Sequence, residues 1–489
     1  MRPAMPAAAL PSTSPQPLIP GPVTQPPRGR RFPPGRWDPW VLAGVLLLAY
    51  AGVSVVRYRH MANRSWDLGI FEQVVRAYAH LRVPVADLKG PGFNILGDHF
   101  SPVTALLAPV YRVLPSPMTL LVAQAALFAV SAVPVTRAAA ALLGRRRGLA
   151  LGLAYGLSWG IQKAVDFDFH EICFAVPMIA YSLEATLAQR WRRALCWALP
   201  LVLVKEDMGL TLAAIAVVVA IRARSSSPRT VPWAIAVAAF GVAATIVTLT
   251  MVIPAFNTTG GYDYWNKVGG SGGGPFDGVD TKLRTLAWLL IPTSGLLALR
   301  SPLLLVAVPT LGWRFFSSES HYWGTDWHYS AVLMPVVTLA LADSLTAVRL
   351  SPRPRLRSYA RHLPTAVVSA SLALTTSLPL SGLTEADAYR KPADVRAVER
   401  MLAKIPDGAS VEANIAPISR LTSRCRVFWL GNTHGVTPDF LAVDNRRKWL
   451  DDSRAYARRL HPRATYAIED ATQGFILLKR EIPRQAVRR

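Results

Sequence analysis

The chain has 489 residues, 51% of them hydrophobic, and its 54 Lys and Arg against 30 Asp and Glu give a formal net charge of +24. Most of this excess is arginine in short segments between long apolar runs, without a nucleic-acid-binding motif, so we expect no nucleic acid partner. The apolar runs, each of roughly 17 to 25 residues, predict membrane-spanning α-helices, and they lack the alternating pattern of β-barrel strands.

Residues 1–36 are rich in Pro, Ala and Ser and then in Arg, which predicts a disordered, basic cytoplasmic tail. Residues 37–382 are expected to form an all-α transmembrane domain of about eleven helices, embedded in the plasma (cytoplasmic) membrane. The apolar segments lie at 40–56, 116–142, 148–163, 172–189, 193–204, 208–222, 231–254, 284–299, 301–316, 329–347 and 363–381.

Basic loops predict the orientation of these helices. Short loops rich in Lys and Arg remain in the cytoplasm. With the N terminus inside, four such loops fall on the cytoplasmic side, at 145–147, 190–193, 222–229 and 349–361. Three arginines, Arg57, Arg59 and Arg64, fall on the outer side in this arrangement, but the four basic loops outweigh this one exception. With about eleven helices, the C terminus is therefore expected outside.

The first outer loop, residues 57–115, is expected to contain a helix of its own. Leu68, Phe71, Val75 and Leu81 recur there at helical spacing, as does Tyr78. An apolar stripe of this kind predicts an amphipathic helix that lies in the membrane interface.

Residues 383–489 change character and predict a small extracytoplasmic α/β domain. A helix-compatible segment, 394–405, precedes a series of short apolar stretches typical of strands. These stretches are 410–415, 427–430, 440–444, 465–468 and 475–478.

The first outer loop also carries candidate catalytic residues. Asp67, at the membrane surface, is suited to act as a general base toward an acceptor hydroxyl, and Asp98 is the second candidate. Trp66, Glu72 and His99 are candidate substrate-binding residues of the same loop. Each motif has a plainer interpretation: Asp67 as a helix N-cap with Trp66 as an interfacial anchor, and the Asp98 segment as a turn.

Asp166, Asp168, His170 and Glu171 place four ionisable groups between two apolar runs. Charge next to lipid is costly and usually functional. On a helix Asp166 and His170 share a face, and on a strand Asp168 joins them. Either arrangement can hold a divalent cation such as Mg²⁺ or Mn²⁺, although the spacing matches no specific metal motif.

Lys205, Glu206 and Asp207 interrupt another apolar hairpin. The lysine is suited to neutralise a phosphate, and the two acids are candidate metal ligands or partners of the lysine. The plainer interpretation is a solvated turn, or one held by a Lys–Asp pair.

The segment 321–329 combines His321 and His328 with several aromatic residues. Aromatic rings suit sugars and histidines suit phosphate, whereas an interfacial aromatic belt explains the rings but not both histidines. The Gly-rich stretch 269–274 lacks the context of a phosphate-binding loop and is expected to be flexible.

Taken together, these motifs resemble the membrane-protein family catalogued as domain of unknown function 2079, over about residues 40–481. The matching stretches are Trp66–Gln73, Gly97–Pro102, Phe167–Glu171, Lys205–Gly209, His321–Tyr329 and the terminal Gly474–Arg480. That family is grouped with polytopic GT-C-type glycosyltransferases that use lipid-phosphate sugar donors. The resemblance implies this superfamily, with Asp67 at the position of the catalytic acid, but no settled activity.

The leading hypothesis is therefore a glycosyltransferase that transfers a sugar from a polyprenyl-phosphate donor to a hydroxyl at the outer face. Asp67 or Asp98 would deprotonate the acceptor, and Lys205, His321 and His328 would stabilise the phosphate. A transporter or lipid flippase is the alternative, but its signs, ionisable residues at midspan and internal repeats, are not evident. A third possibility is a non-catalytic envelope protein whose C-terminal domain binds a partner.

Overall fold

The computed structural model describes residues 35–258, 260–267 and 276–481. The predicted cytoplasmic tail lies outside these residues except for Gly35 and Arg36, and the predicted flexible stretch 269–274 lies outside them entirely.

The described chain is mostly helical, as predicted. Among the described residues, five helical segments are long and apolar enough to cross a membrane: α1 (Asp38–Arg59), α4 (Pro117–Leu143), α9 (Met208–Ser226), Thr230–Phe256 with α10 (Thr230–Val247) and α11 (Ile253–Phe256), and His328–Arg349 with α14 (Leu333–Arg349). The other predicted spans form helices that are shorter or more polar, so the count of eleven stays a prediction. These are α5 (Arg145–Gly156), α6 (Trp159–Asp166), α7 (Ala175–Leu187), α8 (Trp191–Ala198), α12 (Val279–Ser294), α13 (Val308–Phe316) and α15 (Pro354–Thr375).

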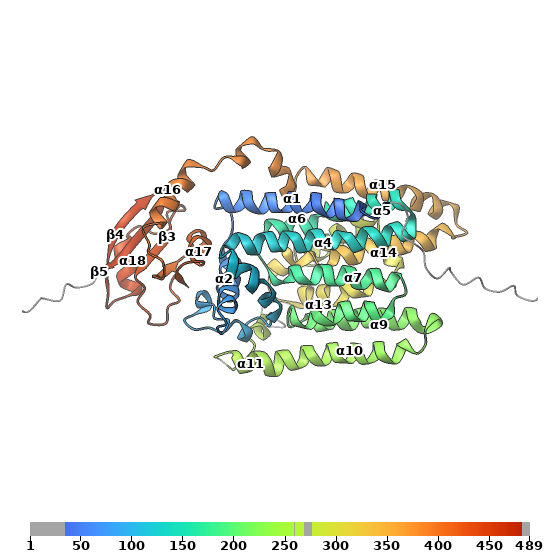
Figure 1. Cartoon of the computed structure of the whole chain (residues 1–489), viewed down its shortest axis with the longest axis horizontal. Coiled ribbons are helices and arrows are strands. Elements are labelled where there is room, and N and C mark those ends of the chain that lie inside the picture. The colour runs from blue at the N-terminus through green and yellow to red at the C-terminus, as the bar shows by residue number, and fades with distance from the viewer. Residues whose placement is uncertain (1–34, 259, 268–275, 482–489) are drawn as a thin grey trace, which may run out of the picture. The chain divides into compact units, whose positions relative to one another are not determined.

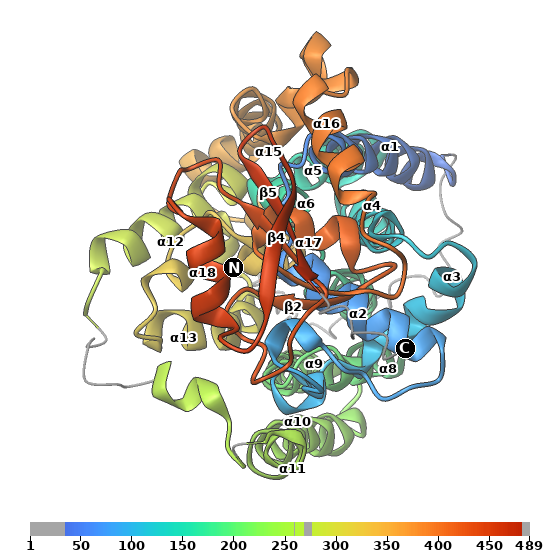
Figure 2. The same cartoon turned by 90° about the vertical axis from the view of Figure 1, so that its left-hand side faces the viewer.

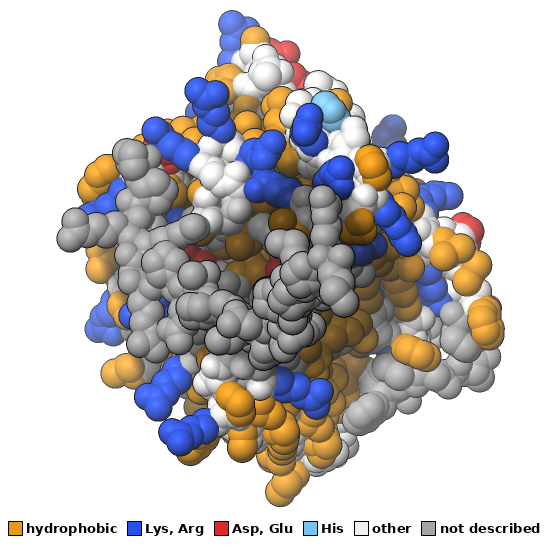
Figure 3. Space-filling view, turned by 90° about the vertical axis from the view of Figure 1, so that its right-hand side faces the viewer, with side chains coloured by type: hydrophobic (Ala, Val, Ile, Leu, Met, Phe, Trp, Pro, Cys, Tyr) orange, Lys and Arg blue, Asp and Glu red, His pale blue; other side chains and the backbone are white. Residues whose placement is uncertain are grey.

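The long helices run side by side in one bundle (Figure 1). α4 is central, in contact with α1, α5, α7 and α14, whereas α10 packs mainly against α9 at one edge of the bundle. The four predicted cytoplasmic loops all connect helices at the same end of the bundle (Figure 1). Figure 3 looks onto this end and shows many Lys and Arg side chains and few acidic ones. This arrangement is the one that the predicted topology requires, although the membrane orientation itself stays a prediction.

The predicted helix in the first outer loop is present as α2 (Trp66–Ala79). Its apolar stripe is buried: Leu68, Phe71 and Val75 lie in the main core of the bundle. Leu81 was expected on the same stripe, but the helix ends before it, and Leu81 has a φ of 55° and is 93% exposed. The short helix α3 (Ala108–Val113) completes this loop beside α2.

The C-terminal segment contains a five-stranded sheet of order β2-β1-β3-β5-β4. All five predicted strands are present, as β1 (Ser410–Ala413), β2 (Arg426–Trp429), β3 (Phe440–Asp444), β4 (Thr465–Thr472) and β5 (Phe475–Glu481). β1, β2 and β3 are parallel, and β5 is antiparallel to β3 and β4. The helices α16 (Ala393–Leu402) and α17 (Ile415–Leu421) contribute to the core on one face, and α18 (Ser453–Leu460) packs on the other.

The sheet region is fastened to α2 through α17, which lies beside α2 in Figures 1 and 2. The hydroxyl groups of Ser65 and Ser419 are 2.8 Å apart, and Gln73 Nε2 donates to the carbonyl oxygen of Val427 at 2.8 Å. Arg76 Nη1 donates to two carbonyl oxygens that follow α17, at 2.9 and 3.0 Å. The C-terminal region therefore holds the helix on which the candidate catalytic acid lies.

Gly69 allows this close approach of α2 and α17. A Cβ atom at Gly69 would lie 2.3 Å from Ile418 Cγ2 and 2.8 Å from Leu88 Cδ1. We therefore expect Gly69→Ala to destabilise the protein by about 1–3 kcal/mol, which thermal unfolding in detergent would measure. Gly44→Ala is the matched control, since Gly44 lies in α1 with nothing within 4 Å of its added Cβ. A Gly69→Ala protein as stable as the Gly44→Ala protein would contradict this packing.

Candidate functional site

The outer motifs form one chain of polar contacts. His99 Nδ1 lies 3.0 Å from Glu206 Oε1, and Lys205 Nζ lies 3.6 Å from Glu171 Oε1. His170 Nδ1 lies 2.7 Å from Glu171 Oε2, although the two groups are not aligned for a hydrogen bond. Because the helices alternate in direction, the ends of α6 and the starts of α9 and α14 lie together, at the end of the bundle that holds α2.

His328 adds the fourth motif to this cluster. Its ring stacks on that of His170 with 3.7 Å between centroids, and it lies 4.9 Å from the ring of Phe167. The side chain is only 3% exposed, and neither ring nitrogen has a hydrogen-bond partner among the described residues. Buried polar atoms usually have a hydrogen-bond partner in the protein or in ordered water.

Asp67 belongs to the fifth motif of this cluster, Trp66–Gln73. Burial is the main factor that raises the pKa of its carboxyl, against the opposing effects of nearby His170, His99 and Lys205. The side chain is half-buried, and no described residue forms a hydrogen bond or ion pair with its carboxylate. The N-cap of α2 is Ser65, so the alternative interpretation of Asp67 as the N-cap is wrong.

Asp98 has a different environment from Asp67. It is 4% exposed and its carboxylate lies 3.0 Å from Lys89 Nζ. Burial alone would raise the pKa of Asp98, but His99 and Lys89 outweigh it and lower the pKa below its usual value. A carboxylate that is ionised and paired is a weaker proton acceptor, so the geometry favours Asp67 over Asp98 as a base.

The candidate metal ligands are divided among protein partners. Asp166 pairs with Arg57 at 2.8 Å, and Asp168 accepts a hydrogen bond of 3.2 Å from Asn63. Burial, together with the neighbouring charge of Asp67, raises the pKa of Asp168 to about 7. Within residues 35–481, as far as they are described, no three His, Cys, Asp or Glu side chains are placed to share a metal ion. The arrangement therefore does not fit the divalent cation considered from the sequence.

Neighbouring charges shift the pKa values of two other groups in the cluster, Glu171 and His99. Burial alone would raise the pKa of Glu171, but His170 and Lys205 outweigh it and lower the pKa to about 2. Burial likewise opposes the charged form of His99, but Glu206 and Asp98 raise its pKa. One carboxylate oxygen of Asp207 is buried without a hydrogen-bond partner in the described structure.

Three candidate substrate-binding residues lie away from this cluster. Glu72 is fully buried and accepts hydrogen bonds from the hydroxyl groups of Tyr111, at 2.9 Å, and Thr422. The ring of Trp66 packs edge-on against Trp429 at 4.7 Å. His321 is 42% exposed and lies 3.4 Å from a carboxylate oxygen of Glu319. Glu72 and Trp66 thus connect α2 to its neighbours, and sequence spacing could not show which side of the helix they occupy.

The buried position of Glu72 predicts a pH-dependent stability. Burial raises the pKa of Glu72 to about 7, although hydrogen bonds from Thr422 and Tyr111 oppose the shift. Its contribution to stability is full below the unfolded-state pKa of about 4.5 and is lost as the pH rises through about 7. As the pH rises from 5 to 8, we expect the free energy of unfolding to fall by up to about 3 kcal/mol more in the wild type than in Glu72→Gln, since each pKa unit corresponds to about 1.4 kcal/mol.

Thermal unfolding across this pH range would measure the difference between the two proteins. Glu469→Gln removes an exposed carboxyl from β4 and is the matched control. Parallel pH profiles for the wild type and Glu72→Gln would contradict a buried carboxyl with a raised pKa.

Sequence reasoning missed three residues of this region. The Tyr262 hydroxyl donates to Glu206 at 3.1 Å, and the Tyr264 ring lies 4.9 Å from His99. Arg314 is fully buried and donates to the carbonyl oxygens of Tyr322 and Gly324, at 2.8 and 2.7 Å, which fixes the turn before His328. An arginine inside an apolar run was the signal for Arg314, because such charges are rarely without a role.

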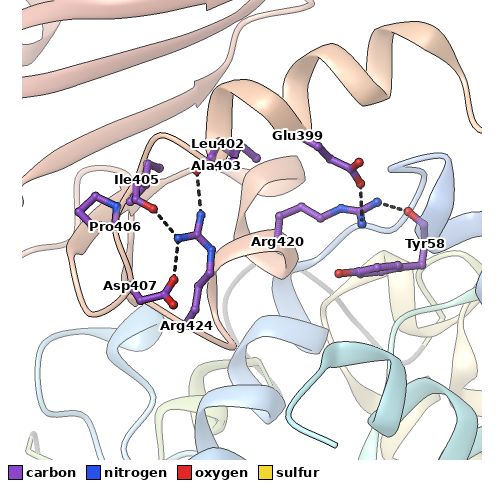
Figure 4. A pocket seen from close by; sticks show the side chains of 9 residues that line it. All are labelled: Tyr58, Glu399, Leu402, Ala403, Ile405, Pro406, Asp407, Arg420 and Arg424. Atoms are coloured by element: carbon purple, nitrogen blue, oxygen red, sulfur yellow. Dashed lines mark hydrogen bonds and ion pairs between the residues drawn. The ribbon is translucent and has the colours of Figure 1, made fainter.

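A separate surface pocket of about 530 Å³ lies between the end of α1 and the helices α16 and α17 (Figure 4). Tyr58, Arg420 and Arg424 contribute to its lining. Both arginines are already paired, Arg420 with Glu399 and Arg424 with Asp407, each at 3.1 Å. None of the candidate site residues lines this pocket.

The comparisons with known proteins agree with these observations. The family described as "Predicted membrane protein (DUF2079)" matches residues 57–477. The chain belongs to the DUF2079 family. No curated protein matches this DUF2079 protein by sequence.

Solved structures give a likeness in fold. ArnT from Cupriavidus metallidurans bound to undecaprenyl phosphate is 12% identical, with a TM-score of 0.54, over 90% of this chain and 98% of that chain. ArnT from the same organism in the apo state is 11% identical, with a TM-score of 0.51 and the same coverage. At this identity the likeness shows the fold alone. The resemblance to the DUF2079 family is confirmed, and the fold is similar to that of ArnT.

Proposed function

We propose that this DUF2079 protein is a membrane glycosyltransferase that transfers a sugar from a polyprenyl-phosphate donor to an acceptor hydroxyl. The observation that carries the proposal is the convergence of five separated motifs around Asp67 and Lys205. The fold of ArnT, a GT-C glycosyltransferase with a structure bound to undecaprenyl phosphate, supports the same class of donor.

Asp67 is the proposed general base. Its side chain is half-buried, and its carboxylate forms no hydrogen bond with the described residues. Its pKa is raised and therefore lies closer to neutral pH than that of an ordinary aspartate. It would take the proton of the acceptor hydroxyl as the oxygen attacks the anomeric carbon of the donor. The bond between the anomeric carbon and the phosphate oxygen then breaks with inversion, and the phosphate leaves with the electron pair.

Lys205 and His328 are proposed to stabilise the leaving phosphate. Burial alone would lower the pKa of Lys205, but Glu171, Glu206 and Asp207 outweigh it and raise the pKa, so the ammonium group stays charged. The ring of His328 stacks on that of His170, and neither of its nitrogens has a hydrogen-bond partner among the described residues. In a site with little water, the fixed charge of Lys205 and an N–H group of the His328 ring would stabilise a developing anion strongly.

We further propose that transfer occurs at the extracytoplasmic face, with residues 383–489 forming a domain there and residues 1–36 inside the cell. The cluster lies at the end of the bundle opposite the four basic loops, which the positive-inside rule places in the cytoplasm. We propose no step through a metal ion, because no three His, Cys, Asp or Glu side chains of the described residues are placed to share one.

Photo-crosslinking tests the donor site. The purified protein in detergent is labelled with a diazirine-bearing undecaprenyl phosphate, and the labelled peptides are mapped by mass spectrometry. We expect saturable labelling near the starts of α9 and α14, with competition by undecaprenyl phosphate but not by undecaprenol. Labelling that undecaprenol displaces equally well would exclude a phosphate-specific site and would favour a structural or transport role.

A further inference from the structure

The C-terminal sheet has one position at which neighbouring parallel strands send their connections to opposite faces. β1 leads into α17 on one face, whereas the chain after β3 leads into α18 on the other. In open α/β sheets, the crevice outside the carboxyl ends of two such strands is the usual place for a ligand. Asn414, after β1, and Asp444, at the end of β3, join these strand ends by hydrogen bonds of 2.9 and 2.6 Å.

The segment that follows β3 at this edge is held in one conformation. The Asn445 side chain donates to the carbonyl oxygen of Leu450 at 2.8 Å and accepts from its N–H at 3.0 Å. The N–H of Lys448 donates to the carbonyl oxygen of Asn445 at 2.8 Å, and Lys448 has a left-handed φ of 52°. Trp449 Nε1 donates to the carbonyl oxygen of Asp444 at 3.0 Å. A loop fixed in this way loses little conformational entropy when it binds a ligand.

Residues 446–449 of this loop are nevertheless exposed to solvent. Trp449 is 46% exposed, and its ring packs edge-on against Tyr456 at 5.5 Å. Arg446 is exposed and paired with Asp444, whereas Arg447 and Lys448 are exposed and have no hydrogen bond or ion pair through their side chains with the described part of the chain. The loop thus presents a fixed indole ring beside cations that are free to bind.

These groups suit a ligand with sugar rings and negative charges. A rigid indole offers a large contact surface at low entropic cost, and Arg and Lys bind carboxylates and phosphates. A flat anionic membrane is a poorer match, because the exposed carboxylates of Asp451 and Asp452 follow directly and would meet the same surface. A chain-like ligand can follow the cations and avoid these acids.

We propose that the loop Arg446–Trp449 binds a saccharide that carries carboxylate or phosphate groups. The same edge of the sheet contacts the membrane domain, since Trp429 at the end of β2 packs against Trp66, the neighbour of Asp67. This binding does not depend on the proposed sugar transfer and can be tested without it.

The test measures binding of two fluorescent probes, hexagalacturonate and mannopentaose phosphate, to the full-length protein in phosphatidylcholine nanodiscs. Maltohexaose is the neutral comparison. We expect saturable binding of at least one charged probe, weakened by salt. Trp449→Ala and the double variant Arg447→Ser/Lys448→Ser should each weaken binding by about tenfold or more. The double variant Arg400→Ser/Arg463→Ser removes two other exposed cations of the C-terminal segment and should bind as the wild type does.

Three results would overturn the proposal. The first is absence of saturable binding of both charged probes to the wild type. The second is equal weakening in the Arg400→Ser/Arg463→Ser protein, which would mean attraction by overall charge. The third is loss of binding when phosphatidylglycerol is added to the nanodiscs, which would make the loop a contact with anionic lipid. Each readout is independent of undecaprenyl phosphate labelling, so failure here leaves the proposed function untouched.

Discussion

Asp67→Asn should lower the rate of sugar transfer by about 10²–10⁴-fold, the usual contribution of a general base. Binding of the lipid-phosphate donor should remain, because the proposed phosphate contacts come from Lys205 and His328. The asparagine keeps the size of the side chain but cannot accept the hydroxyl proton. Transfer is measured in membranes as loss of label from the polyprenyl-phosphate pool, and donor binding by photo-crosslinking of the purified protein.

Two other acids are the controls for Asp67. Asp166→Asn removes a carboxylate that forms a partly exposed ion pair with Arg57, and transfer should fall by less than about tenfold, since such pairs contribute little. Asp98→Asn breaks a buried pair with Lys89, so thermal stability should fall more than transfer per folded molecule. Equal losses of transfer in all three variants would remove Asp67 from its proposed role.

Lys205→Met should both destabilise the protein and abolish donor binding. The side chains of Lys205 and Glu171 are 12% and 0% exposed, and removing the lysine leaves the buried carboxylate of Glu171 with His170 as its remaining partner. Breaking a buried pair in this way costs about 3–5 kcal/mol. The same substitution removes the charge that would attract the donor phosphate. Thermal unfolding and photo-crosslinking measure the two effects separately.

A double variant separates these two effects. Lys205→Met/Glu171→Gln removes both charges, so much of the lost stability should return, whereas labelling by the undecaprenyl phosphate analogue should stay absent. Restored labelling in the double variant would show that Lys205 supports the fold and does not bind phosphate.

The helical class and the C-terminal sheet were predictable because each rests on local patterns. Long apolar runs and short apolar stretches between polar segments require no knowledge of distant contacts. The five strands at Ser410–Ala413, Arg426–Trp429, Phe440–Asp444, Thr465–Thr472 and Phe475–Glu481 follow these stretches closely.

The clustering of the site residues was predictable from the side of the membrane on which each motif is expected. Motifs at the ends of alternating helices must share one end of the bundle, and Asp67, His99, His170, Lys205 and His328 do come together there. What spacing alone could not supply was the direction of each side chain. Glu72 lies five residues after Asp67 in α2. Its carboxylate nevertheless accepts a hydrogen bond from Thr422, the residue that follows α17 and lies 350 positions away in the sequence.

Partners distant in the sequence also explain other features that spacing could not show. Asp166 and Asp168 were candidate metal ligands together with His170. In the structure Arg57, near the end of α1, pairs with Asp166, and Asn63, four residues after α1, donates a hydrogen bond to Asp168. Arg314 lies inside an apolar run and was not considered as a site residue. The carbonyl oxygens that accept its hydrogen bonds lie in the turn that follows this run.

The most direct test of the central claim is the level of polyprenyl-phosphate-linked sugar in cells that lack the gene, measured by mass spectrometry of extracted lipids. Wild-type protein should consume one such lipid, and the Asp67→Asn protein, inserted at the same level, should leave it at the level of the deletion strain. If every polyprenyl-phosphate sugar is unchanged among the deletion, wild-type and Asp67→Asn strains, the protein does not use such a donor.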